Sequence, residues 1–491
     1  MRRLKNFIGG EWRDSAGARV EDLNPADVQD VVADAPASLA AEATAACEAA
    51  ARAFEAWRQT PAPVRGQILF KVQRRMEERR QELAEALTRE EGKTIAESRG
   101  EIQRAINVVE FFAGEARRIT GETIPSELTN NFCYTLKQPI GPVAVITPWN
   151  FPIAIPIWKI APALVSGNTV VFKPASLTPL TAALIVEIFD ECGLPAGVLN
   201  LVFGSGRQVG DAIVQHPAIL AVSFTGSNEV GVGLYSAAAA RGIKCQCEMG
   251  GKNPIVVLGD ADLELAVEST LQGAFGSTGQ RCTATSRAVV VESIAGEFLE
   301  RLEARAASLV VGNGLNPATN VGPSIDERQL ETVLGYVETG QHEGARLVRG
   351  GERLRSDGLD RGYFVAPAIF DRVDANMRIA QEEIFGPVLS LIRVPDNASA
   401  LSVANNVRFG LSASVYTNDV ASMFRFVDRL DAGIVHVNSP TVGGEAHIPF
   451  GGMKATGVGL REMGRVAIDF YTELKVVYVD YTGGVRKSNL Y

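Results

Sequence analysis

Residues 141–174 read GPVAVITPWNFPIAIPIWKIAPALVSGNTVVFKP, and this stretch indicates the fold class. Its two short apolar runs, 141–148 and 169–174, have the length of buried strands. The segment between them, 155–168, has the length of a helix and closes on Gly and Asn. A strand, a helix and a second strand in this order are typical of a parallel sheet.

The alternation continues beyond this stretch. Further strands are predicted at 197–204 and 221–227, with helices at 180–195, 207–217 and 230–242. Such a chain forms an α/β domain, a parallel sheet covered by helices on both faces, and its ligands bind beyond the carboxyl ends of the strands. A second α/β series runs from 253–259 to 433–438 and includes 287–292, 297–313, 362–370 and 412–417.

The flanking regions have other patterns. Apolar residues recur at helical spacing in 38–57 and 66–93, whereas 131–140 alternates like a half-exposed strand. The segment 467–484 is predicted to be a strand near the terminus, and with 125–141 it could form a two-stranded arm. Because an isolated hairpin is marginal in water, we expect this arm to pack on another subunit.

Length and composition bound the classes of function. A chain of 491 residues with 46% hydrophobic residues predicts two or three globular domains. The net charge of −9 argues against a nucleic-acid partner, which requires a basic surface. The N-terminus lacks the pattern of a signal peptide, and no apolar run is long enough to span a bilayer, so we expect a cytoplasmic protein without a membrane partner.

The segment 276–287, GSTGQRCTATSR, raises the question of whether Cys282 is a buried thiol, half of a disulfide, a metal ligand or a nucleophile. The six cysteines contain no C-x-x-C pair and no cluster with zinc spacing, so no metal is expected. Small neighbours would admit a ligand. If a helix begins near Cys282, its N-terminus and Arg281 would lower the pKa of the thiol and favour a nucleophile.

Two glycine-rich turns after predicted strands could hold a dinucleotide. FGSGRQVG, 203–210, is one residue longer than the usual fingerprint, and SFTGSNEVG places Gly226 and Ser227 where a helix would begin. Free N–H groups there favour a pyrophosphate, although Ser227 as a plain N-cap is equally consistent. Lys173 ends a strand at the ligand edge, suited to a phosphate or ribose or serving as an ordinary strand-end charge.

Two further residues could take part in chemistry. Asn150 lies between the prolines of PWNFP, 148–152, where a rigid amide could donate to an oxyanion; the alternative is a turn asparagine. Glu248 precedes the Gly-Gly turn of EMGGKNP, 248–254, and could act as a general base if it is partly buried; the alternative is an exposed loop acid.

Together these motifs closely resemble the aldehyde dehydrogenase superfamily over essentially the whole chain. PWNFP, FKPAS, FTGS, EMGGKNP, GQRC, EEIFGPV and PFGGMKATGVG occur in the order and spacing of that family. The resemblance implies a Rossmann-like NAD(P)-binding domain at 1–124 and 142–250, an α/β catalytic domain at 251–450, and an oligomerisation β-arm at 125–141 and 468–491. It also implies a homo-oligomer, dimer or tetramer.

The resemblance implies that Cys282 attacks an aldehyde, that Asn150 and the backbone N–H of Cys282 hold the oxyanion, and that Glu248 activates the hydrolytic water. Between these steps a hydride passes to the nicotinamide and leaves a thioester. Glu383 and Phe385 match residues at the nicotinamide ribose and ring. The remaining residues implied at the cofactor are Thr147, Pro148, Trp149, Lys173, Ser176, Gly206, Arg207, Phe224, Gly226, Ser227 and Gly250.

One residue departs from the pattern of many NAD-preferring members. They carry a glutamate where this chain has Ser176, and that glutamate accepts hydrogen bonds from the ribose hydroxyls. A neutral serine removes repulsion toward a 2′-phosphate, and Lys173 adds attraction. We therefore predict that NADP is accepted and can be preferred, with NAD also possible as the coenzyme.

Arginines in two motifs predict the class of substrate. Arg281 precedes the nucleophile, and Arg104 lies in a helix resembling one that lines the substrate tunnel; each could grip a carboxylate or make an ordinary ion pair. GQRCTATSR and VNSPTVGGEAHIPFGG look most like members that oxidise 2-oxoglutarate semialdehyde (2,5-dioxopentanoate). Succinate-semialdehyde or broad aliphatic specificity is the alternative. Trp158, Ile448 and Phe450 are expected to be pocket walls or core residues.

Other activities stay open at this point. A CoA-acylating member would release the acyl group to CoA, and the presence of Glu248 favours hydrolysis instead. A cysteine esterase could use the same thiolate and oxyanion site. A non-catalytic structural homologue is disfavoured by the complete set of Cys282, Glu248, Asn150 and Glu383.

Overall fold

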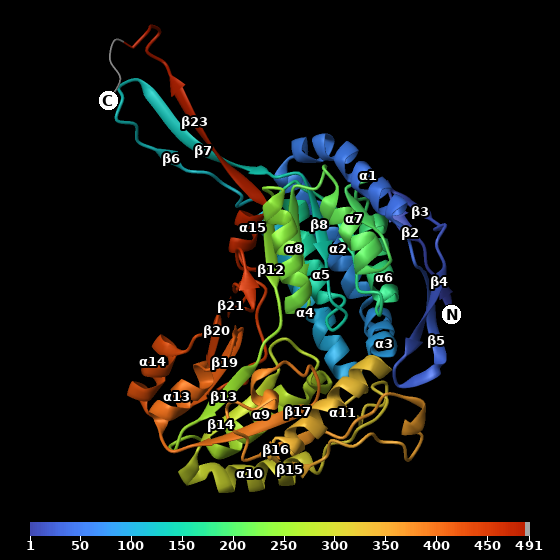
Figure 1. Ribbon diagram of the computed structural model, residues 1–491. Helices are drawn as coiled ribbons and strands as arrows, with labels where there is room; N and C mark the ends of the chain where they lie inside the picture. Colours follow the sequence, from blue (N-terminus) through green and yellow to red (C-terminus); the bar gives the residue numbers. More distant parts are fainter. Residues whose placement is uncertain (487–491) are drawn as a thin grey trace.

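The computed structural model describes residues 1–486 and contains two large sheets, one above the other in Figure 1. The first has eight strands, with five parallel strands at its centre in the order β10-β9-β8-β11-β12. Because β8 lies between the two halves of this series, the strand order reverses beside it, where α/β sheets bind ligands. The strands are β22 Gly457–Val458, β12 Lys244–Glu248, β11 Ala221–Thr225, β8 Pro142–Ile146, β9 Thr169–Lys173, β10 Leu199–Leu201, β2 Asn6–Ile8 and β3 Glu11–Arg13.

Helices cover both faces of this sheet, as the alternating pattern predicted. One face packs on α1 (Ala40–Gln59), α7 (Asp211–Gln215) and α8 (Asn228–Ala240). Helices α5 and α6 contact the opposite face and join α2 to α4 in a larger core. The bounds of these helices are α2 Ala62–Glu78, α3 Arg80–Glu91, α4 Ile95–Glu115, α5 Ala154–Val165 and α6 Pro179–Glu191.

The second sheet has seven strands in the order β15-β16-β17-β14-β13-β19-β20 and is also parallel except at β15. Helices α9 and α10 form one core against it, and α11 to α14 form a second core on the other face. The strands are β13 Asn253–Val257, β14 Thr285–Val291, β15 Arg346–Arg349, β16 Ala368–Asp371, β17 Val388–Val394, β19 Ser412–Tyr416 and β20 Ile434–Val437. The helices are α9 Leu263–Phe275, α10 Glu292–Ala306, α11 Glu327–His342, α12 Arg378–Gln381, α13 Asn397–Asn405 and α14 Val420–Arg429.

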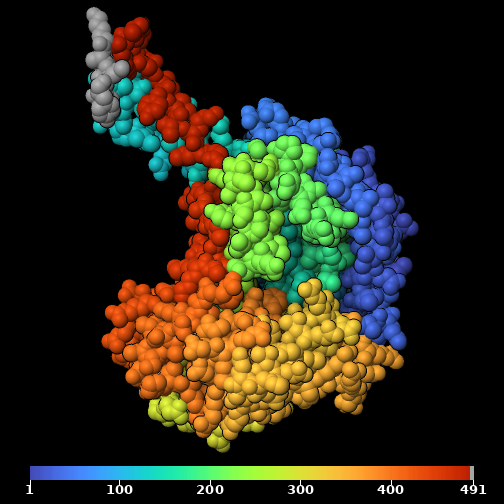
Figure 2. All heavy atoms as spheres, in the orientation of Figure 1, coloured from blue at the N-terminus to red at the C-terminus, as the bar shows by residue number. Residues whose placement is uncertain are grey.

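An arm extends from the body of the molecule (Figures 1 and 2). It consists of three strands in the order β23-β7-β6, namely Thr472–Asp480, Asn131–Pro139 and Thr123–Ile124. The two-stranded prediction missed β6, whose two residues carry too little pattern to reveal it. The predicted terminal strand was too long, because α15 (Val466–Phe470) precedes β23.

Other differences from the predicted elements are local. The predicted helix at 66–93 is two helices divided at Arg79, and the segment 207–217 begins as a π-helical turn, Gly206–Gly210. Within 362–370, only the last three residues belong to a strand, β16. Two small sheets were not predicted: β1 Arg2–Arg3, β4 Arg19–Asn24 and β5 Asp27–Pro36 form one, and β18 Phe409–Gly410 with β21 Met453–Lys454 forms the other.

Candidate active site

A cavity of about 220 Å3 lies where residues of the first sheet and its loops face residues of the second. Cys282 lines it together with eight other residues that the motifs singled out: Pro148, Trp149, Asn150, Gly226, Ser227, Gly250, Glu383 and Phe385. These come from segments up to about 240 positions apart in the chain, and the fold brings them together at one cleft. Ile155, Thr225, Met249 and Gln329 complete its walls.

Cys282 follows a 3-10 turn, Gly276–Gly279, and precedes β14. Its carbonyl oxygen accepts a 2.8 Å hydrogen bond from Asn253 Nδ2, and Asn253 Oδ1 accepts another from the Ser412 N–H at 3.0 Å. Asn253 thereby ties the nucleophile turn to the second sheet. It lies within the EMGGKNP motif, but sequence reasoning assigned it no role.

The backbone of this turn is strained. Ser277, Thr278 and Gly279 have φ angles of 48°, 57° and 68°, a left-handed conformation that non-glycine residues adopt at a cost of about 1–3 kcal/mol each. A Cβ atom on Gly279 would lie 2.3 Å from the Gly386 carbonyl oxygen. The turn before Cys282 therefore touches, backbone to backbone, the loop that carries Phe385.

The thiol environment differs from the prediction. Burial, followed by the nearby Glu383 and Glu248 carboxylates, raises the pKa of Cys282 to about 12, and Arg104 is the group that opposes this shift. The predicted lowering of the pKa by a helix N-terminus and Arg281 is wrong for this state, because no helix begins at Cys282. Arg281 instead forms a 3.0 Å ion pair with Glu97 and hydrogen-bonds to Ser277 Oγ.

Asn150 is buried in the loop between β8 and α5. Its Nδ2 donates a 3.0 Å hydrogen bond to the Gln280 carbonyl oxygen, two residues before Cys282. Its own carbonyl oxygen accepts a hydrogen bond from the buried Lys93 at 2.7 Å. The side-chain amide is therefore held beside the nucleophile turn, as an oxyanion donor requires.

Glu248 ends β12 and is buried, so it is not an exposed loop acid. Its Oε2 accepts a 3.0 Å hydrogen bond from the Gly452 N–H, and Arg461 lies 4.0 Å from Oε1. Burial, with the buried Glu462 as the next cause, raises the pKa of Glu248 well above the ordinary glutamate value. A carboxylate whose pKa is raised in this way is a stronger base than an ordinary glutamate, which suits a general base.

The coenzyme-side residues surround the start of α8. Ser227 is the N-cap of this helix, with its Oγ accepting from the Val230 N–H at 3.4 Å, and Phe224 packs beneath Gly226. The N-cap interpretation of Ser227 is thus correct, and the same turn leaves N–H groups directed toward the cleft. Gly226 has no side chain, so a ligand in the cavity can approach its backbone and the N-terminus of α8. This arrangement fits a dinucleotide pyrophosphate.

Glu383, Phe385 and Gly250 lie on the other side of the cleft. Glu383 Oε1 accepts a 2.9 Å hydrogen bond from the Gly251 N–H, and burial raises the pKa of Glu383 to about 7. A Cβ atom on Gly250 would lie 1.9 Å from Glu383 Oε2, so only glycine fits there. The Phe385 ring meets Trp149 edge to face at 5.3 Å.

The remaining cofactor-side predictions lie outside the cavity walls, on the carboxyl-end side of β8 to β10. Lys173 Nζ donates to the Pro174 carbonyl oxygen at 2.9 Å, and burial lowers the pKa of Lys173 to about 8. Ser176 Oγ donates to the Gly204 carbonyl oxygen at 3.2 Å, and Thr147 is buried next to Lys173 across the strands. Gly206 and Arg207 begin the π-helical turn.

The predicted substrate residues differ in their surroundings. The Trp158 and Phe450 rings are buried, 5.4 Å apart, and Trp158 Nε1 donates to Glu462 at 2.8 Å. Arg104 lies over Trp158, with its guanidinium 5.2 Å from the ring, whereas Ile448 is 48% exposed. Arg104 also lines a separate surface hollow that includes Phe111 and His447.

Gln329 lines the cleft but was missed by sequence reasoning. It lies on α11, and its Nε2 donates to the carbonyl oxygens of Ile384 and Phe385 at 3.0 and 2.9 Å. It therefore holds the loop of the predicted nicotinamide contacts. Gln329 is in none of the recognised motifs, and only the fold brings it to this loop.

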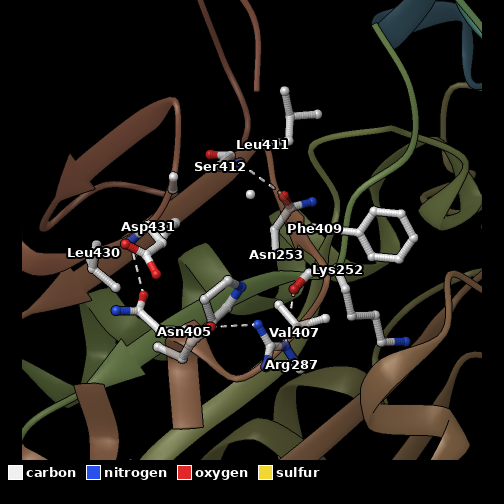
Figure 3. Close-up of a pocket in the computed structure, with 15 residues that line it drawn as sticks. Lys252, Asn253, Arg287, Asn405, Val407, Phe409, Leu411, Ser412, Leu430 and Asp431 are labelled. Atoms are coloured by element: carbon white, nitrogen blue, oxygen red, sulfur yellow. Dashed lines mark hydrogen bonds between the residues drawn. The ribbon is translucent and has the colours of Figure 1, made fainter. Parts of the chain in front are cut away.

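Figure 3 shows a second cavity, lined among others by Asn253, Arg287 and Asn405. Its volume of about 10 Å3 is near the minimum for one water molecule. Arg287 is buried there and donates to the carbonyl oxygens of Lys252, Val403 and Ala404. Asn253, which holds the Cys282 carbonyl oxygen, is one of the residues that line this cavity.

The cysteines other than Cys282 lie away from the cleft walls. Cys245 and Cys247 share one face of β12, with their sulfur atoms 3.5 Å apart. Within residues 1–486, no three His, Cys, Asp or Glu side chains are grouped as a metal site requires. Among the described helices, none has the length and apolar character needed to cross a bilayer.

The fold and the cleft define a dinucleotide-dependent oxidoreductase. Residues 12–477 match the aldehyde dehydrogenase family, so the chain belongs to this family, whose members oxidise aldehydes with NAD or NADP. The resemblance inferred from the seven motifs, the fold class and the enzyme class are thereby confirmed.

Several characterised relatives align with nearly the full chain. Alpha-ketoglutaric semialdehyde dehydrogenase of Bacillus subtilis is 49% identical over 96% of this chain and 97% of its own length. The 2,5-dioxopentanoate dehydrogenase of Saccharolobus solfataricus is 43% identical over 97% and 99%. Betaine aldehyde dehydrogenase from Staphylococcus aureus, solved in complex with NAD+, superposes with a TM-score of 0.95 at 35% identity, covering 98% of this chain and 95% of that chain.

Proposed function

We propose that this enzyme oxidises an aldehyde bearing a carboxylate at its far end, such as 2-oxoglutarate semialdehyde, to the corresponding acid. The observation that carries the proposal is the partly buried guanidinium of Arg104, which has few hydrogen-bond partners. Three related enzymes support it, because their names state 2-oxoglutarate semialdehyde (2,5-dioxopentanoate) as the substrate. They come from Bacillus subtilis, Haloferax volcanii and Saccharolobus solfataricus. The amino-acid sequences of the motifs around Cys282 and at 437–452, which resemble those of enzymes acting on this substrate, support it as well.

Arg104 has the properties of a receptor for a substrate carboxylate. Its Nε is buried without a partner within residues 1–486, and its Nη2 meets only the weak acceptor Met463 Sδ, at 3.6 Å. A partly buried guanidinium without a carboxylate partner leaves donors free, so it could bind an incoming carboxylate through charge-assisted hydrogen bonds. Its charge also opposes the rise in the pKa of Cys282, which indicates that it is near the thiol.

The other predicted substrate contacts have secondary roles in this proposal. Arg281 uses Nε and Nη2 for Ser277 and Glu97, so we assign only its Nη1 to the substrate. The Trp158 and Phe450 rings would form the apolar wall of the tunnel. Ile448, which is exposed, would lie at its mouth.

The residues of this chain divide the reaction into two steps. Cys282 loses its proton and its sulfur attacks the aldehyde carbon, while the Asn150 amide and the Cys282 N–H hold the resulting oxyanion. Bound nicotinamide supplies the hydride acceptor for the oxidation. Glu248 then takes a proton from the water that cleaves the thioester, which favours a carboxylic acid product over acyl transfer to CoA.

The coenzyme proposal rests on Ser176 and Lys173. The Ser176 hydroxyl brings no negative charge to the adenosine ribose. Lys173 is the last residue of β9, three residues before Ser176. We therefore assign both coenzymes to the enzyme, with NADP preferred. We also propose a homo-oligomer, dimer or tetramer, assembled through the arm, and a cytoplasmic location.

A panel of aldehydes tests the substrate. Malonate, succinate and 2-oxoglutarate semialdehydes, together with pentanal, are compared by kcat/KM with NADP+ and with NAD+. Replacing Arg104 by Met should lower kcat/KM for 2-oxoglutarate semialdehyde by about 10- to 100-fold, the effect of losing a charged hydrogen bond. Pentanal, which has the same chain length and no carboxylate, should be affected by less than about threefold.

Arg118→Met is the matched control, because Arg118 lies just beyond the end of the same helix and borders the same hollow but is 59% exposed. It should leave both rates unchanged. An equal loss for pentanal and the semialdehyde in Arg104→Met would contradict the carboxylate contact. A preference for the succinate or malonate compound would move the substrate to a shorter chain.

A further inference from the structure

The loop that carries Asn150 is held at its middle and at its C-terminal end by one buried ion pair. Lys93 Nζ donates to the Asn150 carbonyl oxygen at 2.7 Å and to Glu101 Oε2 at 2.6 Å. The other oxygen, Glu101 Oε1, accepts the N–H groups of Ile153 and Ala154 at 3.0 and 3.1 Å. The pair therefore braces the second half of the loop, from Asn150 to the first residue of α5.

This ion pair is inaccessible to water. The side chains of Lys93 and Glu101 are 1% and 0% exposed, and the ammonium lies 4.0 Å from the centroid of the Phe151 ring. Buried pairs contribute little to net stability, because desolvation offsets most of their attraction. A contribution to conformational specificity is therefore the better explanation for this pair.

We propose that Lys93 and Glu101 are positioning residues that set the direction of the Asn150 amide toward the oxyanion formed at Cys282. This inference rests on the oxyanion role proposed for Asn150. The geometry supports it because the Asn150 side chain is tethered at Gln280 and its backbone at Lys93, so little freedom is left. A displacement of about 1 Å would move the amide out of hydrogen-bonding range and cost up to about 100-fold in rate.

Two reactions of Cys282 separate this role from simple bracing of the fold. Acylation by p-nitrophenyl acetate places the sulfur on a carbonyl carbon, creates an oxyanion and releases p-nitrophenolate. Alkylation by iodoacetamide places the same sulfur on a methylene carbon and releases iodide, without an oxyanion on the reacting carbon. The ratio of the two rates reports the oxyanion site and is independent of the amount of active enzyme.

The test variants are Lys93→Met and the double variant Lys93→Met/Glu101→Gln. The double variant removes both charges of this pair together, so that Glu101 is not left charged without Lys93 if the single variant fails to fold; Glu91, 3.9 Å from Lys93 Nζ, is kept in both variants. We expect the ratio of acylation to alkylation to fall by about 10- to 100-fold in both, as for one lost oxyanion donor. Adding Asn150→Ala to Lys93→Met should lower the ratio no further than Asn150→Ala alone.

Arg65→Met is the matched control. Arg65, on α2, is also a buried cation that contacts α5, but its Nε donates to the Val165 carbonyl oxygen at 2.8 Å, at the opposite end of α5 from Ile153 and Ala154. This variant should lower Tm and leave the ratio unchanged. If it lowers the ratio as much as Lys93→Met does, general loosening of α5 explains the effect and the inference is overturned.

The two levels of the proposal fail in different ways. An unchanged ratio in Asn150→Ala would remove the oxyanion role of Asn150, and the positioning role with it. A lowered ratio in Asn150→Ala with an unchanged ratio in both Lys93 variants would overturn the positioning role alone.

Discussion

At the scale of single residues, Cys282 differs most from what its sequence neighbours suggest. Arg281 precedes it, yet that guanidinium is paired with Glu97, and the positive charge that reaches the thiol comes from Arg104. Burial and, after it, the Glu383 and Glu248 carboxylates raise the pKa of the thiol to about 12, so the thiol is protonated at neutral pH in this state. A substrate or coenzyme that changes the charge at Glu383 or Arg104 would therefore change the reactivity of the nucleophile.

The pH dependence of iodoacetamide alkylation tests this environment. Because only the thiolate reacts and its pKa is about 12, the rate should rise steadily with pH between 7 and 10. Glu383, with its pKa raised to about 7, is charged at pH 8 and repels the thiolate. Glu383→Gln should lower the pKa of Cys282 and speed alkylation at pH 8 by up to about tenfold, or one pKa unit.

Glu382→Gln serves as the control for this prediction. Glu382 is the adjacent residue but pairs with Arg378 at 2.9 Å and is not among the groups that shift the thiol. It should leave the alkylation rate unchanged. Equal acceleration by both substitutions would mean that long-range charge, and not the position of Glu383, controls the thiol.

Motif residues were predictable at this scale, and their partners were not. Asn150, Glu248 and Cys282 could be singled out because unusual residues stand beside prolines and glycines in short, ordered motifs. Lys93 and Gln329 were missed because they reach the site only through the fold, 57 residues before Asn150 and 47 after Cys282. The pKa of Cys282 could not be predicted either, since burial and distant carboxylates set it.

At the scale of elements, the strands β8, β9, β10, β11, β13 and β14 were predictable because each is a short, largely apolar run between turns. The strands β12 and β17 and the edge strands β2, β3, β15 and β22 were not predicted, because polar residues interrupt them or they are too short to carry a pattern. The arm is a different case. Along β23, Leu474, Val476 and Tyr478 point to one face and are 62%, 51% and 71% exposed. Such an apolar face on a projecting sheet favours contact with a second copy of the chain.

Placing a charge on this face tests the arm. Val476→Lys should weaken assembly, because a cation would be buried at the contact; light scattering after size-exclusion chromatography would show a smaller mass. Lys475→Glu, on the opposite face of the same strand, should leave the mass unchanged. An oligomer of normal mass in Val476→Lys would place the contact elsewhere on the molecule.

At the scale of the whole molecule, the cleft joins two sheets with separate cores. Gly226 and Ser227 follow strand β11 of the first sheet, whereas Glu383 and Phe385 precede strand β17 of the second sheet. A dinucleotide that reaches both sets would link the unfolding of the two halves. The sequence indicated two α/β series, but the relative orientation that creates the cleft depends on contacts between residues far apart in the chain.

Thermal unfolding tests this link. NADP+ at about 100 times its Kd should stabilise the folded protein by about 2.7 kcal/mol and raise Tm. Adenosine 2′,5′-bisphosphate is a fragment of NADP+ that would reach only the residues of the first sheet. At the same concentration as NADP+, it should stabilise the protein less. If the fragment raises Tm as much as NADP+ does, the second sheet adds nothing to coenzyme binding.

The contact between Gly279 and Gly386 has a consequence for engineering this enzyme. The two backbone segments approach so closely that there is no room for a side chain at Gly279. The turn before Cys282 and the segment of Phe385 must therefore move together. Attempts to change the coenzyme by redesigning 382–388 will therefore alter aldehyde reactivity too. Libraries that vary both segments together are the ones in which functional combinations should appear.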